Sequence, residues 1–143
     1  MKKYYILFLF FLSLISHAQG DEEPVVWATS VNRISDTTVD LQFDATITDK
    51  WHLYSLEEFE DGPLPTEFAF ELDSLKVRLD GPMTSSNPKI EFDEIFEIDL
   101  PFFEYKAQFT QRLEILDPSI EQISGEINYQ ACDDRLCIFR TEP

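Results

Sequence analysis

Apolar and polar residues alternate along Val39–Ile47, and this alternation constrains the fold more than any other feature of the sequence. A period of two places every second side chain on the same face of a strand, so that one face is buried and the other is solvated. The same pattern returns at Phe68–Leu72, Tyr105–Phe109 and Ile127–Ala131. No window of about eleven residues keeps a helical stripe, so the sequence predicts an all-β fold.

Shorter segments and turn signals extend this prediction over the rest of the chain. The shorter strand candidates are Val25–Val31, Trp51–Ser55, Leu75–Leu79 and Phe96–Leu100. About seven to nine short strands at this spacing predict a single antiparallel β-sandwich domain. The stretches Gly62–Pro65 and Gly81–Pro88 are expected to be ordered loops that are too short to separate domains. An antibody-type disulfide between the sheets is excluded, because both cysteines lie within one hexapeptide.

The N-terminus has the pattern of an export signal. Lys2 and Lys3 precede the apolar run Tyr4–Ile15, and Ser16–Ala18 is a small-x-small cleavage site. We therefore expect residues 1–18 to be a signal peptide and residues 19–143 to be the mature domain. An uncleaved N-terminal anchor is the alternative. No other long apolar stretch follows, so we expect no membrane insertion after cleavage. Export would place the cysteines in an oxidising compartment such as the periplasm, where a disulfide persists.

The chain is strongly acidic, with 11 basic and 28 acidic residues and a net charge of −17. Removal of Lys2 and Lys3 with the signal peptide leaves 9 basic residues and a net charge of −19. Such a surface repels phosphate backbones, which argues against nucleic-acid binding. The acidic residues are scattered through the strand-like segments, so a solvated acidic surface is the favoured interpretation.

Cys132 and Cys137 are the only cysteines, and four residues separate them. A disulfide that closes a loop of six residues stabilises a fold by only about 2 kcal/mol, against about 4.7 kcal/mol for a loop of 100 residues. The pair could therefore be a local staple or an exchangeable redox pair, and the spacing alone leaves both open. Zinc usually needs four Cys or His ligands, and the mature chain adds only His52. No calcium loop and no Gly-x-Ser-x-Gly nucleophile motif occurs, so we expect no metal, no cofactor and no hydrolase.

The segment Tyr129–Cys137 resembles the active-site strand and loop of the N-terminal periplasmic domain of the thiol:disulfide interchange protein DsbD. An aromatic residue precedes a first Cys, and an acidic spacer leads to a second Cys. Three further stretches are similar to the family and occur in its order, and these are Trp51–Ser55, Gly62–Phe68 and Tyr105–Gln111. The resemblance covers roughly Val25 to Cys137, which is nearly the whole mature chain.

This resemblance implies an immunoglobulin-like sandwich whose cysteines cycle between dithiol and disulfide in the periplasm. In the family, the domain takes electrons from a thioredoxin-like domain that a membrane-embedded domain feeds. It passes them to periplasmic isomerases and to cytochrome-maturation thioredoxins. Cys137 would form the mixed disulfide with partners, and Cys132 would resolve it. The chain would then act as a protein-disulfide reductase component.

The resemblance also implies a loop that caps the cysteines. The matching stretch is Asp93–Phe96, in which Asp93 and Glu94 belong to the loop and Phe96 is the expected cap. His52 and Tyr54 would line the site, by match to an aromatic pair on a neighbouring strand. Ordinary core packing is the alternative explanation for Tyr54 and Phe96.

The chain departs from the family pattern after Cys137. The family commonly continues with a Pro-containing segment and a last strand, whereas only Ile138–Pro143 follow here. We therefore expect the final strand to be short or missing. The membrane and thioredoxin-like domains are also absent from this sequence, which would make it a stand-alone module or part of a larger protein. The rival hypothesis is a secreted binding or adhesion module with a purely structural disulfide, in which Trp27, Trp51 and Tyr105 are exposed ligand platforms.

Overall fold

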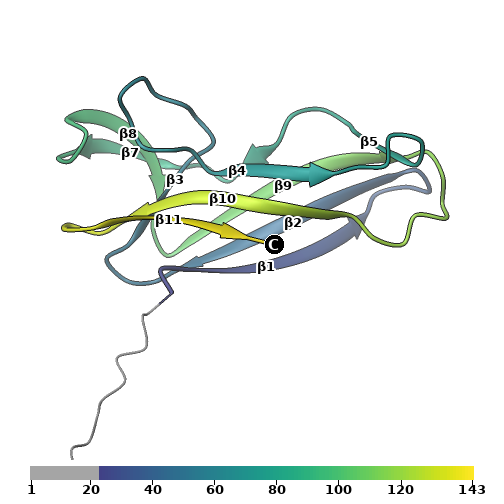
Figure 1. Cartoon of the computed structure of the whole chain (residues 1–143), viewed down its shortest axis with the longest axis horizontal. Coiled ribbons are helices and arrows are strands. Elements are labelled where there is room, and N and C mark those ends of the chain that lie inside the picture. The colour runs from purple at the N-terminus through teal and green to yellow at the C-terminus, as the bar shows by residue number, and fades with distance from the viewer. Residues whose placement is uncertain (1–22) are drawn as a thin grey trace, which may run out of the picture.

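The computed structural model describes residues 23–143, which form two antiparallel β-sheets and no helix (Figure 1). The strands are β1 (Val25–Arg33), β2 (Thr38–Ile47), β3 (His52–Tyr54), β4 (Glu67–Glu71), β5 (Val77–Leu79), β6 (Thr84–Ser85), β7 (Lys89–Asp93), β8 (Ile98–Phe103), β9 (Lys106–Ile115), β10 (Ser124–Cys132) and β11 (Cys137–Glu142). The predicted all-β, immunoglobulin-like sandwich is confirmed. The predicted signal peptide, residues 1–18, and its cleavage site lie outside the described residues.

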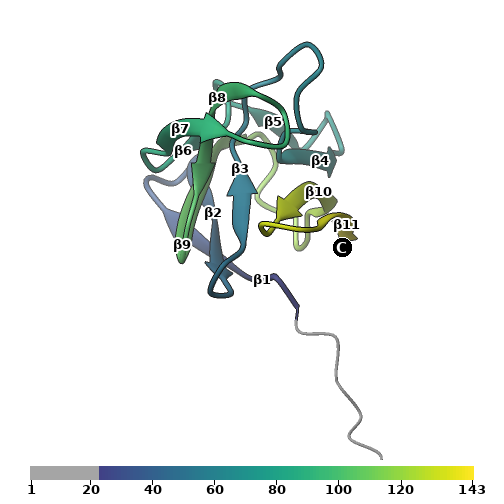
Figure 2. The same cartoon turned by 90° about the vertical axis from the view of Figure 1, so that its left-hand side faces the viewer.

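The strand order of the two sheets explains how the end that carries the cysteines is built. The first sheet has the order β1-β2-β9-β5, and β6 also pairs with β9. The second has the order β11-β10-β3-β8-β7, and β4 also pairs with β10. The first half of β10 pairs with β4, whereas its last two residues, Ala131 and Cys132, pair with β3. This change of partner brings β3, β7 and β8 to the end of the sandwich where β10 turns into β11 (Figure 2).

The period-two pattern of the sequence forms the core between the sheets. Phe43 of β2 lies opposite Phe109 of β9, and the inward side chains of β2 and β9 are buried along both strands. From the second sheet, Leu53, Ile127 and Tyr129 pack against them. Period-two burial therefore places these apolar side chains in one core, as the alternation predicts.

Two of the three proposed aromatic platforms belong to this core instead. Trp27 and Trp51 pack against the core residues, and the Trp27 ring contacts Phe109 and Tyr129 at centroid distances of 5.7 and 5.6 Å. Only Tyr105 is exposed, in a turn where its φ is 64°. Two of the three aromatic residues that the binding-module hypothesis proposed as exposed ligand contacts therefore pack against the core instead.

The expectation that the final strand is short or missing is wrong. β11 is six residues long and pairs with β10 at six positions, from Cys132↔Cys137 to Ile127↔Glu142. β7 was not predicted at all, and β8 begins two residues later than the predicted Phe96–Leu100 strand. Residues 84–85, expected in a loop, form the short strand β6.

Within residues 23–143 no helix is long and apolar enough to cross a membrane. In the same part of the chain, no group of three or more His, Cys, Asp or Glu side chains is arranged to hold a metal ion.

Candidate redox site at the β10–β11 turn

Cys132 and Cys137 form a disulfide across the tip of the β10–β11 hairpin. Cys132 ends β10 and Cys137 begins β11, and their Cα atoms lie 4.1 Å apart as a directly opposed pair. Asp133 fixes the turn between them, because its Oδ1 accepts hydrogen bonds from the backbone N–H groups of Arg135 and Leu136 at 2.8 and 2.7 Å. These backbone hydrogen bonds lower the pKa of the Asp133 carboxyl below its ordinary value. The acidic spacer therefore builds the turn that holds the cysteines face to face.

The disulfide lies on the outer face of its sheet and not in the main core. Along β10, Ile127, Tyr129 and Ala131 point into the core, so Gln130 and Cys132 point the opposite way. Cys132 is nevertheless fully buried, with 0 % of its surface exposed. Another layer of side chains must therefore cover this outer face.

A second apolar cluster, here called the site cluster, provides this cover. Its buried members are Tyr54, Leu100, Phe102 and Cys132, and Phe59, Phe96, Ile98 and Cys137 pack against them. β3 and β8 are consequently buried on both faces at this end of the molecule. In β8, Leu100 and Phe102 belong to the site cluster while Phe103 belongs to the main core. The sequence signal was the unbroken apolar run Leu100–Phe103, since strands buried on both faces do not alternate.

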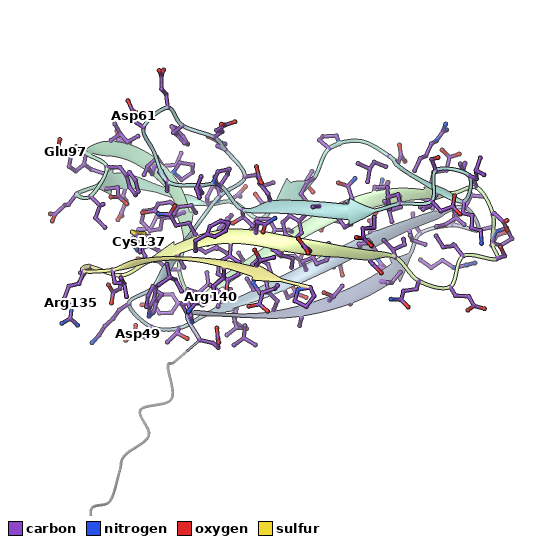
Figure 3. All side chains as sticks on the ribbon, viewed as in Figure 1. Asp49, Asp61, Glu97, Arg135, Cys137 and Arg140 are labelled. Atoms are coloured by element: carbon purple, nitrogen blue, oxygen red, sulfur yellow. A yellow bond between two sulfur atoms is a disulfide. The ribbon has the colours of Figure 1, made fainter. Side chains whose placement is uncertain are left out.

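The two cysteines differ in exposure. Cys132 is fully buried, whereas Cys137 is half-buried at the rim of the site cluster. Figure 3 shows Cys137 at the same end of the molecule as Asp61, Glu97 and Arg135. Cys137 is therefore the more exposed residue of the pair.

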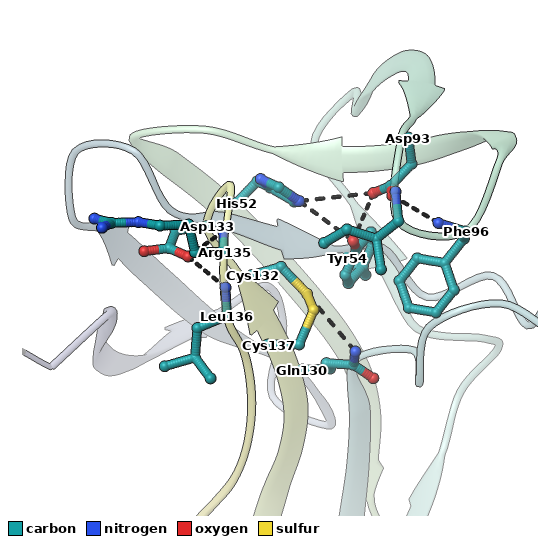
Figure 4. A network of polar contacts seen from close by, with 11 residues as sticks. His52, Tyr54, Asp93, Phe96, Gln130, Cys132, Asp133, Arg135, Leu136 and Cys137 are labelled. Carbon is teal, nitrogen blue, oxygen red and sulfur yellow. Dashed lines mark hydrogen bonds and ion pairs between the residues drawn. A yellow bond between two sulfur atoms is a disulfide. The ribbon is translucent and has the colours of Figure 1, made fainter.

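His52, Tyr54 and Asp93 form a hydrogen-bonded chain beside the disulfide (Figure 4). The Tyr54 hydroxyl donates to Asp93 Oδ2 at 2.7 Å and lies 3.2 Å from His52 Nε2. Because the hydroxyl proton is used on Asp93, His52 Nε2 must donate to the Tyr54 oxygen. Burial lowers the pKa of His52, against the opposing charge of Asp93, so this contact is a hydrogen bond of a neutral imidazole. Burial and the Asp93 hydrogen bond raise the pKa of Tyr54, which stays protonated.

Asp93 also fixes the loop between β7 and β8, residues 94–97, here called the cap loop. Its Oδ1 accepts hydrogen bonds from the backbone N–H groups of Ile95 and Phe96 at 2.8 and 3.1 Å. The Phe96 ring then packs edge-on against Tyr54, with centroids 5.9 Å apart, and against the site cluster. Glu94 lies exposed in the cap loop, outside this network. The structure thus brings His52, Tyr54, Asp93 and Phe96 together around the cysteines and leaves Glu94 at the surface.

A second loop, residues 55–66 between β3 and β4, covers the other side of the site cluster. Thr66 anchors it by donating from Oγ1 to the Tyr54 carbonyl at 2.7 Å. Phe59 packs from this loop onto the site cluster, and Gly62 folds back on it. A Cβ on Gly62 would lie only 2.7 Å from the Phe59 Cβ, so the turn accepts only glycine at this position without a shift.

Gln130 connects this second loop to the disulfide, and the sequence analysis missed it. Its Oε1 accepts a hydrogen bond from the Leu64 backbone N–H at 2.8 Å, and its Nε2 donates to Cys132 Sγ at 3.7 Å. The available signal was its position two residues before Cys132, on the same face of a strand.

The comparisons with known proteins agree with this geometry. The family model described as "Thiol:disulfide interchange protein DsbD, N-terminal" matches residues 22–143. The chain belongs to this family. Membership makes it a thiol–disulfide exchange domain of the periplasmic type. No curated protein matches the sequence significantly.

Two solved structures are similar to this DsbD N-terminal family member. The N-terminal periplasmic domain of ScsB from Proteus mirabilis is 15 % identical, with a TM-score of 0.61, and the alignment covers 85 % of this chain and 45 % of that chain. The reduced DsbD N-terminal domain of Neisseria meningitidis is 16 % identical, with a TM-score of 0.49, and the alignment covers 81 % and 82 % of the two chains. The chain thus spans less than half of the ScsB domain, whose similarity supports the shared fold.

Proposed function

We propose that this domain relays electrons through Cys132–Cys137 between a thioredoxin-like reductant and other periplasmic redox proteins. The observation that carries the proposal is the position of the disulfide. It bridges two opposed strand positions on the outer face of the sheet, and Cys137 is partly exposed while Cys132 is buried. The proposal includes export directed by residues 1–18, with residues 19–143 as the working domain.

The hairpin makes the bond easy to break and remake. Six register pairs between β10 and β11 hold the two cysteines opposite each other. These backbone pairs do not depend on the sulfur–sulfur bond, so the thiols of the reduced protein stay close enough to re-form it. The bond itself adds only about 2 kcal/mol in the chain-entropy model. A disulfide with so small a contribution to stability is suited to exchange.

The proposed roles of the two cysteines follow from their access. A partner thiolate attacks Sγ of Cys137, and the Cys132–Cys137 bond breaks as the mixed disulfide forms. In the reverse direction, Cys132 attacks the mixed disulfide and releases the partner. We expect Phe96 and the cap loop, which pack on the site cluster, to limit access to the disulfide, so that a docking partner displaces them while stray thiols react slowly.

The charges around the turn favour a relay over an autonomous oxidant. Asp133 and Asp134 lie beside Cys132, and negative charge disfavours a thiolate, while Arg135 acts in the opposite direction. We therefore expect no strongly activated free thiol, unlike the nucleophiles of thioredoxin-type motifs. The alkylation rate of the reduced protein against pH measures this, and a thiol that titrates well below neutrality would contradict it.

Trapping of mixed disulfides tests the function directly. With a periplasmic thioredoxin-like protein as partner, Cys132→Ser should accumulate the mixed disulfide and Cys137→Ser should abolish it. The reduction potential provides the second measurement, since structural disulfides typically lie below about −300 mV and exchanging ones lie above. A bond that no thioredoxin-like dithiol reduces in the folded protein would reject the relay.

A further inference from the structure

The buried sulfur atom of Cys132 has a polar partner, the side chain of Gln130, to which the proposed exchange assigns no role. Gln130 Nε2 lies 3.7 Å from Cys132 Sγ, within hydrogen-bonding distance for a sulfur acceptor. Cys132 is fully buried in the site cluster, among Tyr54, Leu100 and Phe102. Among residues 23–143, Gln130 is the side-chain donor that the structure gives to this sulfur atom.

The orientation of the Gln130 amide is fixed by its other contact. The backbone N–H of Leu64 can only donate, and it lies 2.8 Å from Gln130 Oε1. The amide oxygen must therefore face Leu64, which leaves the NH₂ group facing Cys132 Sγ. The Leu64 contact therefore orients the amide, and Figure 4 shows the NH₂ group of Gln130 directed at the disulfide.

Exchange places a negative charge on this sulfur atom. When a partner thiolate bonds to Sγ of Cys137, the Cys132–Cys137 bond breaks and its electron pair leaves on Cys132 as a thiolate. The partner's second thiol then attacks the partner sulfur of the mixed disulfide, Cys137 leaves, and the partner becomes a disulfide. The two protons of the partner dithiol end on Cys132 and Cys137, so two electrons and two protons are transferred.

We propose that Gln130 is a catalytic residue whose amide N–H stabilises the Cys132 thiolate as it leaves and as it attacks. A thiolate that is buried in an apolar cluster is destabilised, because it loses its hydration and no hydrogen-bond donor replaces the water. A hydrogen bond to the charged form stabilises that form selectively, and a leaving thiol with a lower pKa leaves faster. The role rests on the proposed function, but the hydrogen bond can be tested without any partner protein.

Two substitutions of Gln130 separate the sulfur contact from the loop contact. Gln130→Glu keeps an acceptor for the Leu64 N–H but loses the donor to Cys132. Gln130→Met loses both contacts and adds no charge. The matched control is Asn128→Asp, an amide-to-acid change two residues earlier on the same face of β10, where Asn128 bonds to Thr141. It measures the effect of one added negative charge alone.

The first measurement is the pKa of the Cys132 thiol in a Cys137→Ala background, followed by thiolate absorbance or by the NMR shift of the Cys132 β-carbon. Gln130→Met should raise this pKa by about one unit, the size expected for a hydrogen bond to a charged group. Gln130→Glu should raise it at least as much and more than Asn128→Asp does. With both cysteines present, the rate of reduction by dithiothreitol should fall about three- to tenfold in the Gln130 variants. Circular dichroism and denaturation midpoints select the variants that remain folded.

The outcomes distinguish the role of Gln130 from the relay itself. If Gln130→Glu behaves like Asn128→Asp, the added charge explains its effect, and if only Gln130→Met shows an effect, the lost loop contact explains it. In either case the catalytic role is wrong. If the pKa shifts appear but no thioredoxin-like protein reduces the wild-type disulfide, the role of Gln130 stands and the relay fails. If the relay works while the Gln130 variants react at the wild-type rate, only the present inference fails.

Discussion

At the scale of single residues, Asp93 does more than the sequence suggested. One carboxylate oxygen accepts the Tyr54 hydroxyl, and the other accepts two backbone N–H groups of the cap loop. With 7 % of its surface exposed, Asp93 is buried and yet has partners for both oxygen atoms. The cap loop and the inner wall of the site are therefore coupled through one side chain.

Asp93→Ala should release the cap loop and leave the Tyr54 hydroxyl without its acceptor. Loss of a buried partner of this kind costs about 1–3 kcal/mol, so the free energy of unfolding should fall by that amount. The rate at which dithiothreitol reduces the disulfide should rise several-fold, because Phe96 no longer covers it. Glu94→Ala, one residue further and exposed, is the control and should change neither quantity. Equal rates for the two variants would show that Asp93 does not hold the cap.

His52 should make the stability of the fold depend on pH near neutrality. Burial lowers its pKa from the ordinary 6.5, although the charge of Asp93 opposes this shift. The unfolded chain therefore takes up a proton at a higher pH than the folded protein does. The contribution of neutral His52 is complete above pH 6.5 and is lost as the pH falls toward the folded-state pKa.

Urea denaturation at about pH 7.5 and about pH 5.5 measures this effect in a window where most carboxylates stay ionised. The wild-type midpoint should be lower at the acid end. His52→Gln keeps a donor for the Tyr54 oxygen but does not titrate, so its midpoint should change less between the two conditions. A wild-type midpoint that rises on acidification would contradict the assignment of a neutral imidazole.

At the scale of the elements, local alternation predicted the strands that bury one face, whereas the residues of the site were predicted only through the resemblance to the DsbD N-terminal family. The long strands β2, β9 and β10 each bury one face, so the spacing of Phe43, Phe109 and Tyr129 was enough to place them in the core. β3 and β8 are buried on both faces by the two loops that cover the disulfide. This cover depends on contacts distant in sequence, such as Tyr54 with Asp93, which no local pattern encodes.

Two departures from the predicted strands, at β7 and β11, have separate physical causes. In β7, the sequence Lys-Ile-Glu-Phe-Asp does alternate, but it is short, both apolar residues Ile90 and Phe92 are exposed, and Asp93 is the buried residue. The turn after β7 ends at Glu97 with a φ of 59°, a conformation that glycine usually adopts and that the sequence did not signal. The final strand was expected to be short or missing because only Ile138–Pro143 follow Cys137, whereas every residue from Cys137 to Glu142 pairs with β10.

The β10–β11 hairpin should survive reduction of its disulfide. The bond closes a loop of six residues, so its loss should lower the free energy of unfolding by about 2 kcal/mol or less. For comparison, Phe109→Ala removes a fully buried ring of the main core and should cost about 3–5 kcal/mol. Denaturation of the oxidised and reduced protein, beside oxidised Phe109→Ala, gives the three values. A larger loss on reduction than in Phe109→Ala would mean that the bond is a structural staple.

At the scale of the whole molecule, the side chains that form the main core are separate from those that surround the disulfide. The main core lies between the sheets, whereas the site cluster lies on the outer face, at the end of the sandwich where β10 turns into β11. This end also carries exposed charge, negative from Glu97 of the cap loop and Asp134 of the hairpin turn and positive from Arg135. The net charge of −17 extends the same field over the surface as a whole.

This field should select thiols by their charge. A cationic thiol such as cysteamine is attracted to the acidic end, and an anionic thiol such as mercaptopropionate is repelled. At low salt, the ratio of the reduction rate with cysteamine to the rate with mercaptopropionate should exceed the ratio of their intrinsic reactivities by about threefold or more. The ratio should approach its intrinsic value near 1 M salt, where the Debye length is about 3 Å. Stopped-flow rates on an unfolded Cys-x₄-Cys peptide of neutral sequence supply the intrinsic ratio.

Asp134→Asn should bring the low-salt ratio part of the way toward that intrinsic value, because it removes one charge next to the hairpin without touching the Asp133 bonds that build the turn. Glu71→Gln, an equal charge change on exposed β4, is the matched control. It should have a smaller effect if the local field at Cys137 decides the preference. Equal effects of the two variants would assign the preference to the net charge of the molecule. A ratio that does not respond to salt would show that charge has no part in the approach to Cys137, and partner selection would then depend on shape at the cap loop alone.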